Sequence, residues 1–162
     1  MFKGKIFIAS DHAGFRLKNI IKKYLIKERY NLKDLGPKKY KPTDDYPDYA
    51  IKVVKKVLKT KDSRGILICG SGQGMAIVAN RFKGIYAVVC WNKTSAKKAR
   101  EEENSNILCL GARLIKPKTA RSIVKVWLET PFTYLKRHLR RINKIKKIKN
   151  NGKKRGKRKF KR

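Results

Sequence analysis

Three short segments of this sequence carry groups that could move protons or bind an anion. They are Asp11-His12-Ala13-Gly14, Cys69-Gly70-Ser71-Gly72-Gln73-Gly74 and Gly111-Ala112-Arg113. A carboxylate, an imidazole or a thiol can act as an acid or a base, and a guanidinium or a row of backbone N–H groups can hold a phosphate. Each segment alone also has a structural explanation: Asp11 as a helix cap, the glycines as a tight turn and Arg113 as a surface charge. Chemistry is expected only if the segments meet in the fold.

The glycine-rich segment is the best candidate for holding an anion. It offers backbone N–H groups that no Cβ atom obstructs, and it precedes a predicted helix. The partial positive charge of a helix N-terminus suits an anion, so we expect Gly70, Gly72 and Gly74 to cradle an oxyanion. The segment lacks the third glycine of the dinucleotide fingerprint and the Lys-Ser/Thr pair of the Walker loop. No nucleotide cofactor is therefore expected.

Cys69 comes immediately before this glycine loop, at the predicted end of a strand. Helix dipoles and cationic neighbours at such a place lower the pKa of a thiol, which makes it a usable base or nucleophile. The alternative is a cysteine packed inertly in the core, and this is our interpretation of Cys90 and Cys109. The three cysteines show no CxxC or CxxH spacing, so neither a disulfide framework nor a zinc site is predicted.

Two arginines near the C-terminus, Arg137 and Arg141, are four positions apart and so share one face of a predicted helix. Two guanidinium groups on one face can converge on a phosphate, although a solvated basic face explains them as well in so basic a chain. His12, one of two histidines, is a candidate phosphate donor. As a metal ligand it lacks partners, and no metal is expected.

Short β-branched runs alternate with helical patterns, which is typical of βαβ units and predicts an α/β fold with a mainly parallel sheet. The five predicted strands are Lys5–Ser10, Asn31–Leu35, Gly65–Cys69, Tyr86–Cys90 and Ile107–Leu110. The predicted helices are Gly14–Glu28, Tyr49–Lys59, Gly74–Arg81, Thr94–Glu103, Pro117–Leu128 and Tyr134–Ile148. Because ligands in such sheets bind at the carboxyl ends of the strands, the three segments should lie at one edge.

The first predicted helix has a clear apolar face. Leu17, Ile21 and Leu25 recur at helical spacing, and Lys18 and Lys22 are expected on the solvent side.

The charge of the chain is strongly unbalanced. Its 162 residues include 45 Lys and Arg against 11 Asp and Glu, a net charge of +34, and 41% are hydrophobic, enough for a packed core. We predict one domain over residues 1–149 and a basic, disordered tail over residues 150–162. The longest apolar run, Ile85 to Trp91, is far shorter than the roughly 20 residues of a membrane span. Without a predicted span or signal peptide, we expect a cytoplasmic protein.

Several longer motifs occur in the order found in one known family. From Lys5 to about Ile145 the chain resembles the type B ribose-5-phosphate isomerases and the related galactose-6-phosphate isomerase subunits. The motifs that carry the resemblance are Ser10-Asp11-His12-Ala13-Gly14, Thr43-Asp44-Asp45-Tyr46-Pro47-Asp48-Tyr49-Ala50, Ile66-Leu67-Ile68-Cys69-Gly70-Ser71-Gly72-Gln73-Gly74-Met75, Ala79-Asn80-Arg81, Asn106-Ile107-Leu108, Leu110-Gly111-Ala112-Arg113 and Arg137-His138 through Arg141.

The resemblance implies a Rossmann-like three-layer domain that interconverts ribose 5-phosphate and ribulose 5-phosphate through a cis-enediolate, without cofactor or metal. This aldose–ketose isomerisation belongs to the non-oxidative branch of the pentose phosphate pathway. Carried over, Cys69 is the base that moves a proton between C1 and C2, and Ser71 with the N–H groups of the glycine loop holds the enediolate oxygen. Some members carry a carboxylate at the position of Met75, so the chain resembles the cysteine subtype.

The resemblance also implies how the substrate is bound. The implied phosphate ligands are His12, Arg113, Arg137 and Arg141. Arg113 would be offered by a partner chain, Asp11 and Tyr46 would contact sugar hydroxyls, and Asn80 would support the glycine loop. The implied assembly is a homodimer, able to pair into a tetramer, whose two active sites are each shared between subunits.

One segment departs from the family pattern. Many members carry Arg-x-His-Asn before the fifth strand, where the His assists opening of the furanose ring, but this chain has Glu102 and Glu103 at the last two positions. A carboxylate with a raised pKa could open the ring instead, which would make Glu102 catalytic. Alternatively the enzyme prefers another sugar phosphate, such as a six-carbon aldose 6-phosphate, or uses the open form. In the third alternative Glu102 is only part of an exposed helix end.

The net charge supports a rival interpretation, an isomerase-like fold that binds RNA. A strongly basic protein attracts polyanions, and the segment 153–162 is rich in Lys and Arg. It contains one aromatic residue, Phe160, so stacking on bases is not favoured. A basic proteome, in which such a charge carries no function, is a further alternative.

Overall fold

The computed structural model describes residues 1–148, and the predicted tail lies outside them. The strands are β1 (Ile6–Ser10), β2 (Leu32–Asp34), β3 (Arg64–Cys69), β4 (Ala87–Val89) and β5 (Ile107–Gly111). The helices are α1 (Phe15–Lys27), α2 (Tyr46–Lys59), α3 (Gln73–Ala79), α4 (Lys93–Glu101), α5 (Pro117–Glu129) and α6 (Lys136–Lys146). All predicted strands and helices are present, and their ends differ from the predictions by at most three residues.

The strands form one sheet in the order β2-β1-β3-β5-β4, and all neighbouring strands in the described part of the chain are parallel. The sheet predicted as mainly parallel is therefore wholly parallel there. Ile8 of β1 pairs with Ile66 of β3, and Leu67 of β3 pairs with Cys109 of β5. Because these three strands are neighbours, their carboxyl ends meet at one edge. The prediction that the three reactive segments come together is confirmed.

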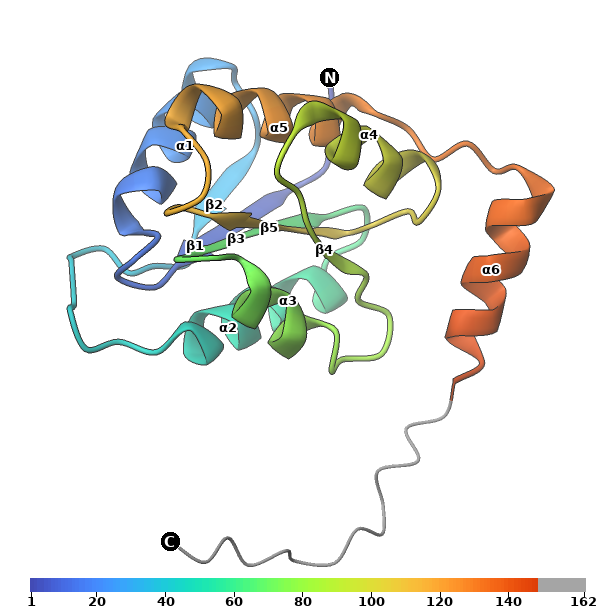
Figure 1. The fold of residues 1–162 in the computed structure, drawn as a ribbon, viewed down its shortest axis with the longest axis horizontal. Helices are drawn as coiled ribbons and strands as arrows, with labels where there is room; N and C mark the ends of the chain where they lie inside the picture. The colour runs from blue at the N-terminus through green and yellow to red at the C-terminus, as the bar shows by residue number, and fades with distance from the viewer. Residues whose placement is uncertain (149–162) are drawn as a thin grey trace, which may run out of the picture.

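Helices cover both faces of the sheet. Figure 1 shows α1, α4 and α5 on one face and α2 and α3 on the other. Side chains alternate along β1: Ile6 and Ile8 pack with the first set of helices, and Phe7 and Ala9 pack with the second. All four are buried, which explains why the strand is a nearly continuous apolar run. This arrangement confirms the three-layer α/β fold.

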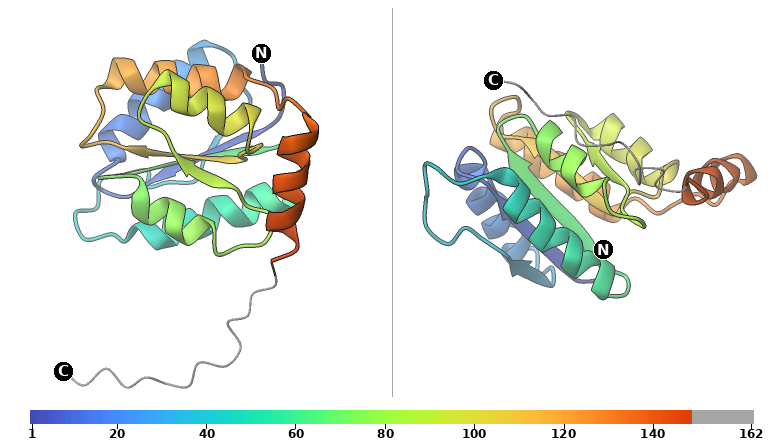
Figure 2. Two further views of the ribbon diagram at one scale, coloured as in Figure 1. Left: turned by 45° about the vertical axis from the view of Figure 1, so that its right-hand side comes forward. Right: turned by 90° about the horizontal axis from the view of Figure 1, so that it is seen from below.

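The last helix stands beside the three layers instead of covering the sheet. Figures 1 and 2 show α6 at the side of the domain, joined to it by the segment after α5. Its His138 and Ile142 are buried, whereas Leu139 and Ile145 are exposed. Within residues 1–148, no helix is both long and apolar enough to cross a membrane.

The start of α2 differs most from the prediction, because the helix begins at Tyr46 and not at Tyr49. Pro47 lies in its first turn, where the missing N–H of proline has no helical partner to lose. The earlier start fixes Tyr46 at the end of the loop between β2 and α2, beside the carboxyl ends of the strands.

Candidate functional site

A cleft of about 320 Å³ opens at the carboxyl ends of β1, β3 and β5. Its lining residues come from the three reactive segments and the start of α2: Asp11, His12, Ala13, Tyr46, Cys69, Gly70, Ser71, Gly74, Arg113 and Leu114. A larger hollow of about 1190 Å³ lies between Asn80–Tyr86 and Ile145–Ile148, but it contains no thiol, imidazole or carboxylate. The smaller cleft is therefore the candidate active site.

The glycine loop wraps around the sulfur of Cys69. The backbone N–H of Gly72 donates to Cys69 Sγ at 3.1 Å, and a donor aimed at sulfur stabilises negative charge there. Gly72 has a φ of +80°, and a Cβ at this position would lie 3.0 Å from the carbonyl carbon of Leu110. The loop thus needs glycine here for its backbone conformation and for its close approach to β5.

Ser71 and Gly74 complete the wall beside the thiol. Ser71 Oγ accepts the N–H of Gln73 at 3.3 Å at the start of α3. A Cβ on Gly74 would lie 2.7 Å from Tyr46 Cζ, so the tyrosine ring packs directly on the glycine. This contact brings the start of α2 against the loop and places the tyrosine in the cleft lining.

The other two cysteines are core residues, as predicted. Burial raises the pKa of the Cys90 thiol to about 11, and burial raises that of Cys109 well above its ordinary value. Neither residue lines the cleft. Cys69 is the thiol that combines burial in the strand with access to this site.

Asp11 holds the turn before α1 and lines the cleft, but it does not cap the helix, because the N-cap of α1 is Gly14. Its Oδ1 accepts the N–H of Gly14 at 2.9 Å, which holds the turn into α1. Burial raises the pKa of its carboxyl, an effect that the Gly14 N–H and the charge of His12 partly oppose. Asp11 therefore stabilises the β1–α1 turn and also remains a candidate for contact with a ligand in the cleft.

His12 is held by Asp44, a residue to which we had assigned no role. Asp44 Oδ1 accepts the backbone N–H of His12 at 2.7 Å and lies 3.0 Å from its Nδ1. This side-chain bond is the main cause that raises the pKa of His12 above 6.5. The two residues are 32 positions apart, so no local spacing rule links them. The only signal in the sequence was the motif of the resemblance that contains Asp44.

Arg113 lies in the cleft of its own chain. Its backbone N–H donates to the carbonyl oxygen of Gly70 at 3.0 Å, and a Cβ on Gly70 would lie 3.2 Å from the guanidinium Nη1. This placement corrects the expectation that a partner chain offers Arg113. The reason is the strand order, which sets the turn after β5 directly beside the turn after β3.

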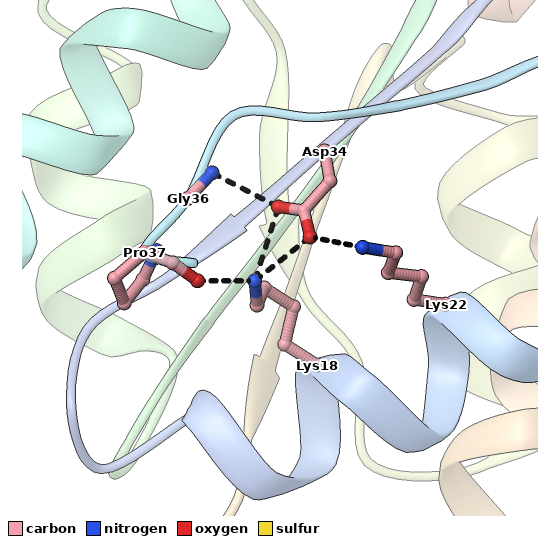
Figure 3. A network of polar contacts seen from close by, with 5 residues as sticks. All are labelled: Lys18, Lys22, Asp34, Gly36 and Pro37. Atoms are coloured by element: carbon pink, nitrogen blue, oxygen red, sulfur yellow. Dashed lines mark hydrogen bonds and ion pairs between the residues drawn. The ribbon is translucent and has the colours of Figure 1, made fainter. Parts of the chain in front are cut away.

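A buried lysine holds the start of the loop between β2 and α2 (Figure 3). Lys18 Nζ donates to both oxygens of Asp34 at 3.0 Å and to the carbonyl oxygen of Pro37 at 2.7 Å. Asp34 also accepts bonds from Lys22 and from the Gly36 N–H. The prediction that Lys18 faces solvent is wrong, because these acceptors allow its ammonium group to be fully buried.

Glu102 lies outside the cleft, at the C-terminal end of α4. Lys98 Nζ donates to its Oε1 at 2.7 Å, and this bond lowers the pKa of Glu102 below 4.5. An acid that opens a sugar ring needs a raised pKa, so the pairing works against the role suggested for Glu102. With Lys98 and Glu103, it lines a separate hollow of about 410 Å³.

The remaining predicted residues also lie away from the cleft lining. Arg137 and Arg141 are exposed on α6, where Arg137 Nε donates to His138 Nε2 at 3.1 Å. Asn80 bonds to the backbone N–H and C=O of Ala87, both at 2.8 Å, so it supports the start of β4 and not the glycine loop. One chain therefore brings eight of the predicted residues together and leaves Glu102, Arg137, Arg141, Asn80 and Gly72 outside the lining.

The donor set suits an anion better than a metal ion. The cleft offers an imidazole, a guanidinium, backbone N–H groups and one thiol, with the carboxylate of Asp11 in the same lining. Among residues 1–148, no cluster of three or more His, Cys, Asp or Glu is arranged to hold a metal. The fold and the cleft together are those of an α/β enzyme of the open parallel-sheet type, with a site suited to a small anionic substrate.

Comparison with known proteins identifies the family. The model of the Ribose/Galactose Isomerase family matches residues 6–145, and the chain belongs to this family of isomerases. It is 44% identical over 141 residues to the "Probable ribose-5-phosphate isomerase B" of Mycoplasma genitalium, covering 86% of this chain and 92% of that protein. It is 40% identical over 130 residues to the D-erythrulose-4-phosphate isomerase of Pectobacterium atrosepticum, covering 78% and 84%.

A solved structure agrees with the fold. The ribose-5-phosphate isomerase B of Mycoplasma genitalium with bound ribulose-5-phosphate superposes with a TM-score of 0.84 at 41% identity. The match covers 88% of this chain and 93% of that one. The resemblance expected from the sequence motifs is therefore confirmed.

Proposed function

We propose that this cleft interconverts ribose 5-phosphate and ribulose 5-phosphate, with Cys69 as the base. The observation that carries the proposal is the geometry around Cys69 Sγ: the thiol receives the Gly72 N–H at 3.1 Å and shares one cleft with His12 and Arg113. The relative with bound ribulose-5-phosphate supports the choice of substrate.

The proton transfers balance within the substrate and one thiol. The Cys69 thiolate removes the proton from C2 of the open aldose, and the electron pair forms the C1–C2 double bond of an enediolate. As this double bond forms, the electrons of the C1 carbonyl move to O1. The hydroxyl proton of O2 then passes to O1, and the thiol returns its proton to C1 as the carbonyl forms at C2. Ser71 and the N–H groups of the glycine loop stabilise the negative oxygen, a contribution of about 3–4 kcal/mol for one such donor.

His12 and Arg113 bind the phosphate in this proposal. Both line the cleft, and the pKa of His12, raised mainly by its bond to Asp44, favours the cationic form that suits a phosphate. Asp11 and Tyr46 line the same cleft and contact the sugar hydroxyls. All four residues come from one chain. A second copy of the chain is therefore needed only for Arg137 and Arg141, which lie on α6 and outside the cleft lining.

A second copy supplies Arg137 and Arg141. These arginines are exposed on α6, which stands at the side of the domain (Figure 2). We propose a homodimer in which this helix reaches the cleft of the partner and completes the phosphate site. In a symmetric pair both clefts are completed in the same way.

The substrate range depends on the segment around Glu102. Because its pKa is lowered by Lys98, we do not assign ring opening to Glu102. The relative named for D-erythrulose 4-phosphate at 40% identity supports the alternative that the preferred sugar phosphate differs from ribose 5-phosphate. Four-, five- and six-carbon phosphates are therefore compared in one assay.

The decisive experiment measures isomerase activity on these phosphates for the native chain, Cys69→Ala and Cys90→Ala. We expect turnover of the five-carbon pair, a loss of about 10²–10⁴-fold in Cys69→Ala and little change in Cys90→Ala. Activity on four- or six-carbon phosphates without activity on the five-carbon pair would show that the substrate is another sugar phosphate. Full activity in Cys69→Ala would exclude the thiol as base.

A mixing experiment tests the shared site. Cys69→Ala and Arg141→Met are each expected to be nearly inactive, and their co-expression should restore about a quarter of the native activity. Half of randomly formed dimers then contain one intact site out of two. A mixture no more active than its parents would contradict the sharing of Arg141 between copies.

A second candidate function is non-specific RNA binding. The observation that favours it is α6, where Lys136, Arg137, Arg140, Arg141, Lys144 and Lys146 are all exposed. Retention on RNA should fall steeply with salt, and removing residues 150–162 should weaken it without changing isomerase activity. Retention that is independent of salt would contradict this electrostatic binding.

A further inference from the structure

The contact between Asp44 and His12 joins two loops at the edge of the cleft. His12 belongs to the β1–α1 turn, and Asp44 belongs to the loop between β2 and α2. One oxygen of Asp44 accepts the backbone N–H of His12 at 2.7 Å and lies 3.0 Å from Nδ1 of the ring. Asp44 therefore fixes both the backbone and the side chain of His12.

The partners of Nδ1 determine the tautomer of the ring. Nδ1 faces Asp44 Oδ1 and also the backbone oxygen of Asp44, at 3.2 Å. Both are acceptors when the carboxyl is ionised, so Nδ1 carries a hydrogen whether the ring is neutral or charged. Nε2 is the nitrogen that gains and loses the proton, and it is the atom left for a ligand.

The environment of Asp44 favours a cation at His12. The Asp44 side chain is only 8% exposed, and its Oδ2 is buried without a hydrogen-bond partner in the described part of the chain. Tyr49 of α2 also faces this carboxylate, because burial and the nearby Asp44 raise the pKa of its hydroxyl to about 12. Among residues 1–148, His12 is the group that pairs with Asp44 as a cation, and a buried carboxylate gains from such a positive charge. Asp11 on the β1–α1 turn acts in the same direction, whereas Arg113 brings positive charge into the same cleft.

The loop that carries Asp44 is fixed at both ends. At its start, Lys18 holds Asp34 and the carbonyl oxygen of Pro37 (Figure 3). At its other end, the first turn of α2 begins at Tyr46. The segment that presents Asp44 to His12 is therefore held by α1, through Lys18, and by the start of α2.

We propose that Asp44 is a positioning residue, which orients the His12 ring with Nε2 free for the cleft and maintains its charge for an anionic ligand. The inference rests on the proposed function only for the identity of that ligand. The carboxylate of Asp44 thereby becomes part of the site, and it acts on the substrate only through His12.

The test compares Asp44→Asn with Asp45→Asn in the full chain. Asp45 is the adjacent carboxylate, is exposed and makes no ion pair within residues 1–148, so its variant removes the same charge without the contact. NMR titration of the two histidines, with His12→Gln to assign the signals, reads the charge of each ring directly.

We expect Asp44→Asn to lower the titration midpoint of His12 by at least about one pH unit, as the loss of an adjacent charge does. His138 should not move, and Asp45→Asn should leave both midpoints within a few tenths of a unit. In activity assays near pH 7.5, Asp44→Asn should raise KM about tenfold, with a smaller change in kcat.

Two results would overturn the inference. One is an unchanged His12 midpoint in a folded Asp44→Asn variant. The other is a neutral His12 in the native chain with its proton on Nε2, which ¹⁵N shifts reveal even if the variant does not fold. If His12 behaves as expected but no sugar phosphate is turned over, the inference stands and the proposed function fails.

Discussion

Two lysine–carboxylate ion pairs in this molecule have the same chemistry but differ in burial. Lys18 and Asp34 meet at 3.0 Å beside the cleft, and Lys98 and Glu102 meet at 2.7 Å at the end of α4. The Lys18 side chain is 1% exposed, whereas that of Lys98 is 61% exposed. The shorter contact is the weaker one, because water and mobile ions screen it.

The two pairs lie in regions of different kinds, one with loops bound to each other and one with charges that face solvent. Around the cleft, each loop is tied to another part of the same chain: Lys18 to Pro37, His12 to Asp44 and Arg113 to Gly70. At the α4–α6 end, Glu102, Arg137 and Arg141 present charge outward. Substitutions in the first region should therefore disturb the fold, and those in the second should act only where another molecule binds.

The largest effect on stability is expected from Lys18→Met. Removing Lys18 leaves Asp34 with the more exposed Lys22 alone and leaves the carbonyl oxygen of Pro37 without this donor, and breaking a buried ion pair costs about 3–5 kcal/mol. Urea denaturation measures the free energy of unfolding. Lys22→Met is the matched control, since Lys22 binds the same carboxylate with its side chain 39% exposed and should cost less than about 1 kcal/mol. Equal losses would show that burial does not distinguish the two lysines.

Gly14→Ala should have the next largest effect. An added Cβ would lie 2.3 Å from the backbone oxygen of Ile68, which is held in the central strand β3. We therefore expect the free energy of unfolding to fall by about 1–3 kcal/mol. In Gly74→Ala the Cβ meets the ring of Tyr46, which can turn away, so the melting temperature should fall less while KM rises. The melting temperatures of both variants rank the two contacts. A larger loss for Gly74→Ala would contradict this ranking.

Acid should weaken the buried pair selectively. Burial by itself would raise the pKa of Asp34, but the Gly36 N–H and the two lysines outweigh it and lower the pKa below 3.8. A carboxyl with a lowered folded-state pKa stabilises the protein above its unfolded pKa, and the contribution is lost as pH falls through the folded one. The stability gap between the native chain and Lys18→Met should therefore narrow below about pH 4. If the difference in free energy of unfolding stayed constant down to about pH 2.5, the ionised carboxylate of Asp34 would not be its source.

The smallest effect is expected from Glu102→Gln. Its side chain is 28% exposed and is paired with Lys98 at the end of α4, so the melting temperature should change little. The value of kcat/KM for ribose 5-phosphate should fall less than about tenfold, below the 10²–10⁴-fold contribution of a general acid. A large loss confined to the ring-forming aldose, with the ketose unaffected, would restore Glu102 as the group that opens the ring.

The sequence was sufficient for the elements and for much of the cleft, because both depend on local pattern. Apolar runs mark strands that are buried on two faces. Cys69 ends one of these strands, and the turns after two others carry Asp11 and Arg113. The origin of Arg113 could not be predicted, since it depends on β5 lying beside β3. Only long-range contacts show that Lys18 is buried and that Asp44 holds His12.

The strand order also bears on how the chain acquires its site during synthesis. In the described sheet β4 has a single neighbour, β5, which follows it in the chain and separates it from β3. As the polypeptide leaves the ribosome, β4 therefore has no strand to pair with until the segment around Cys109 has emerged. Arg113 follows a few residues later, so the sheet is completed and the cleft acquires its guanidinium at nearly the same moment.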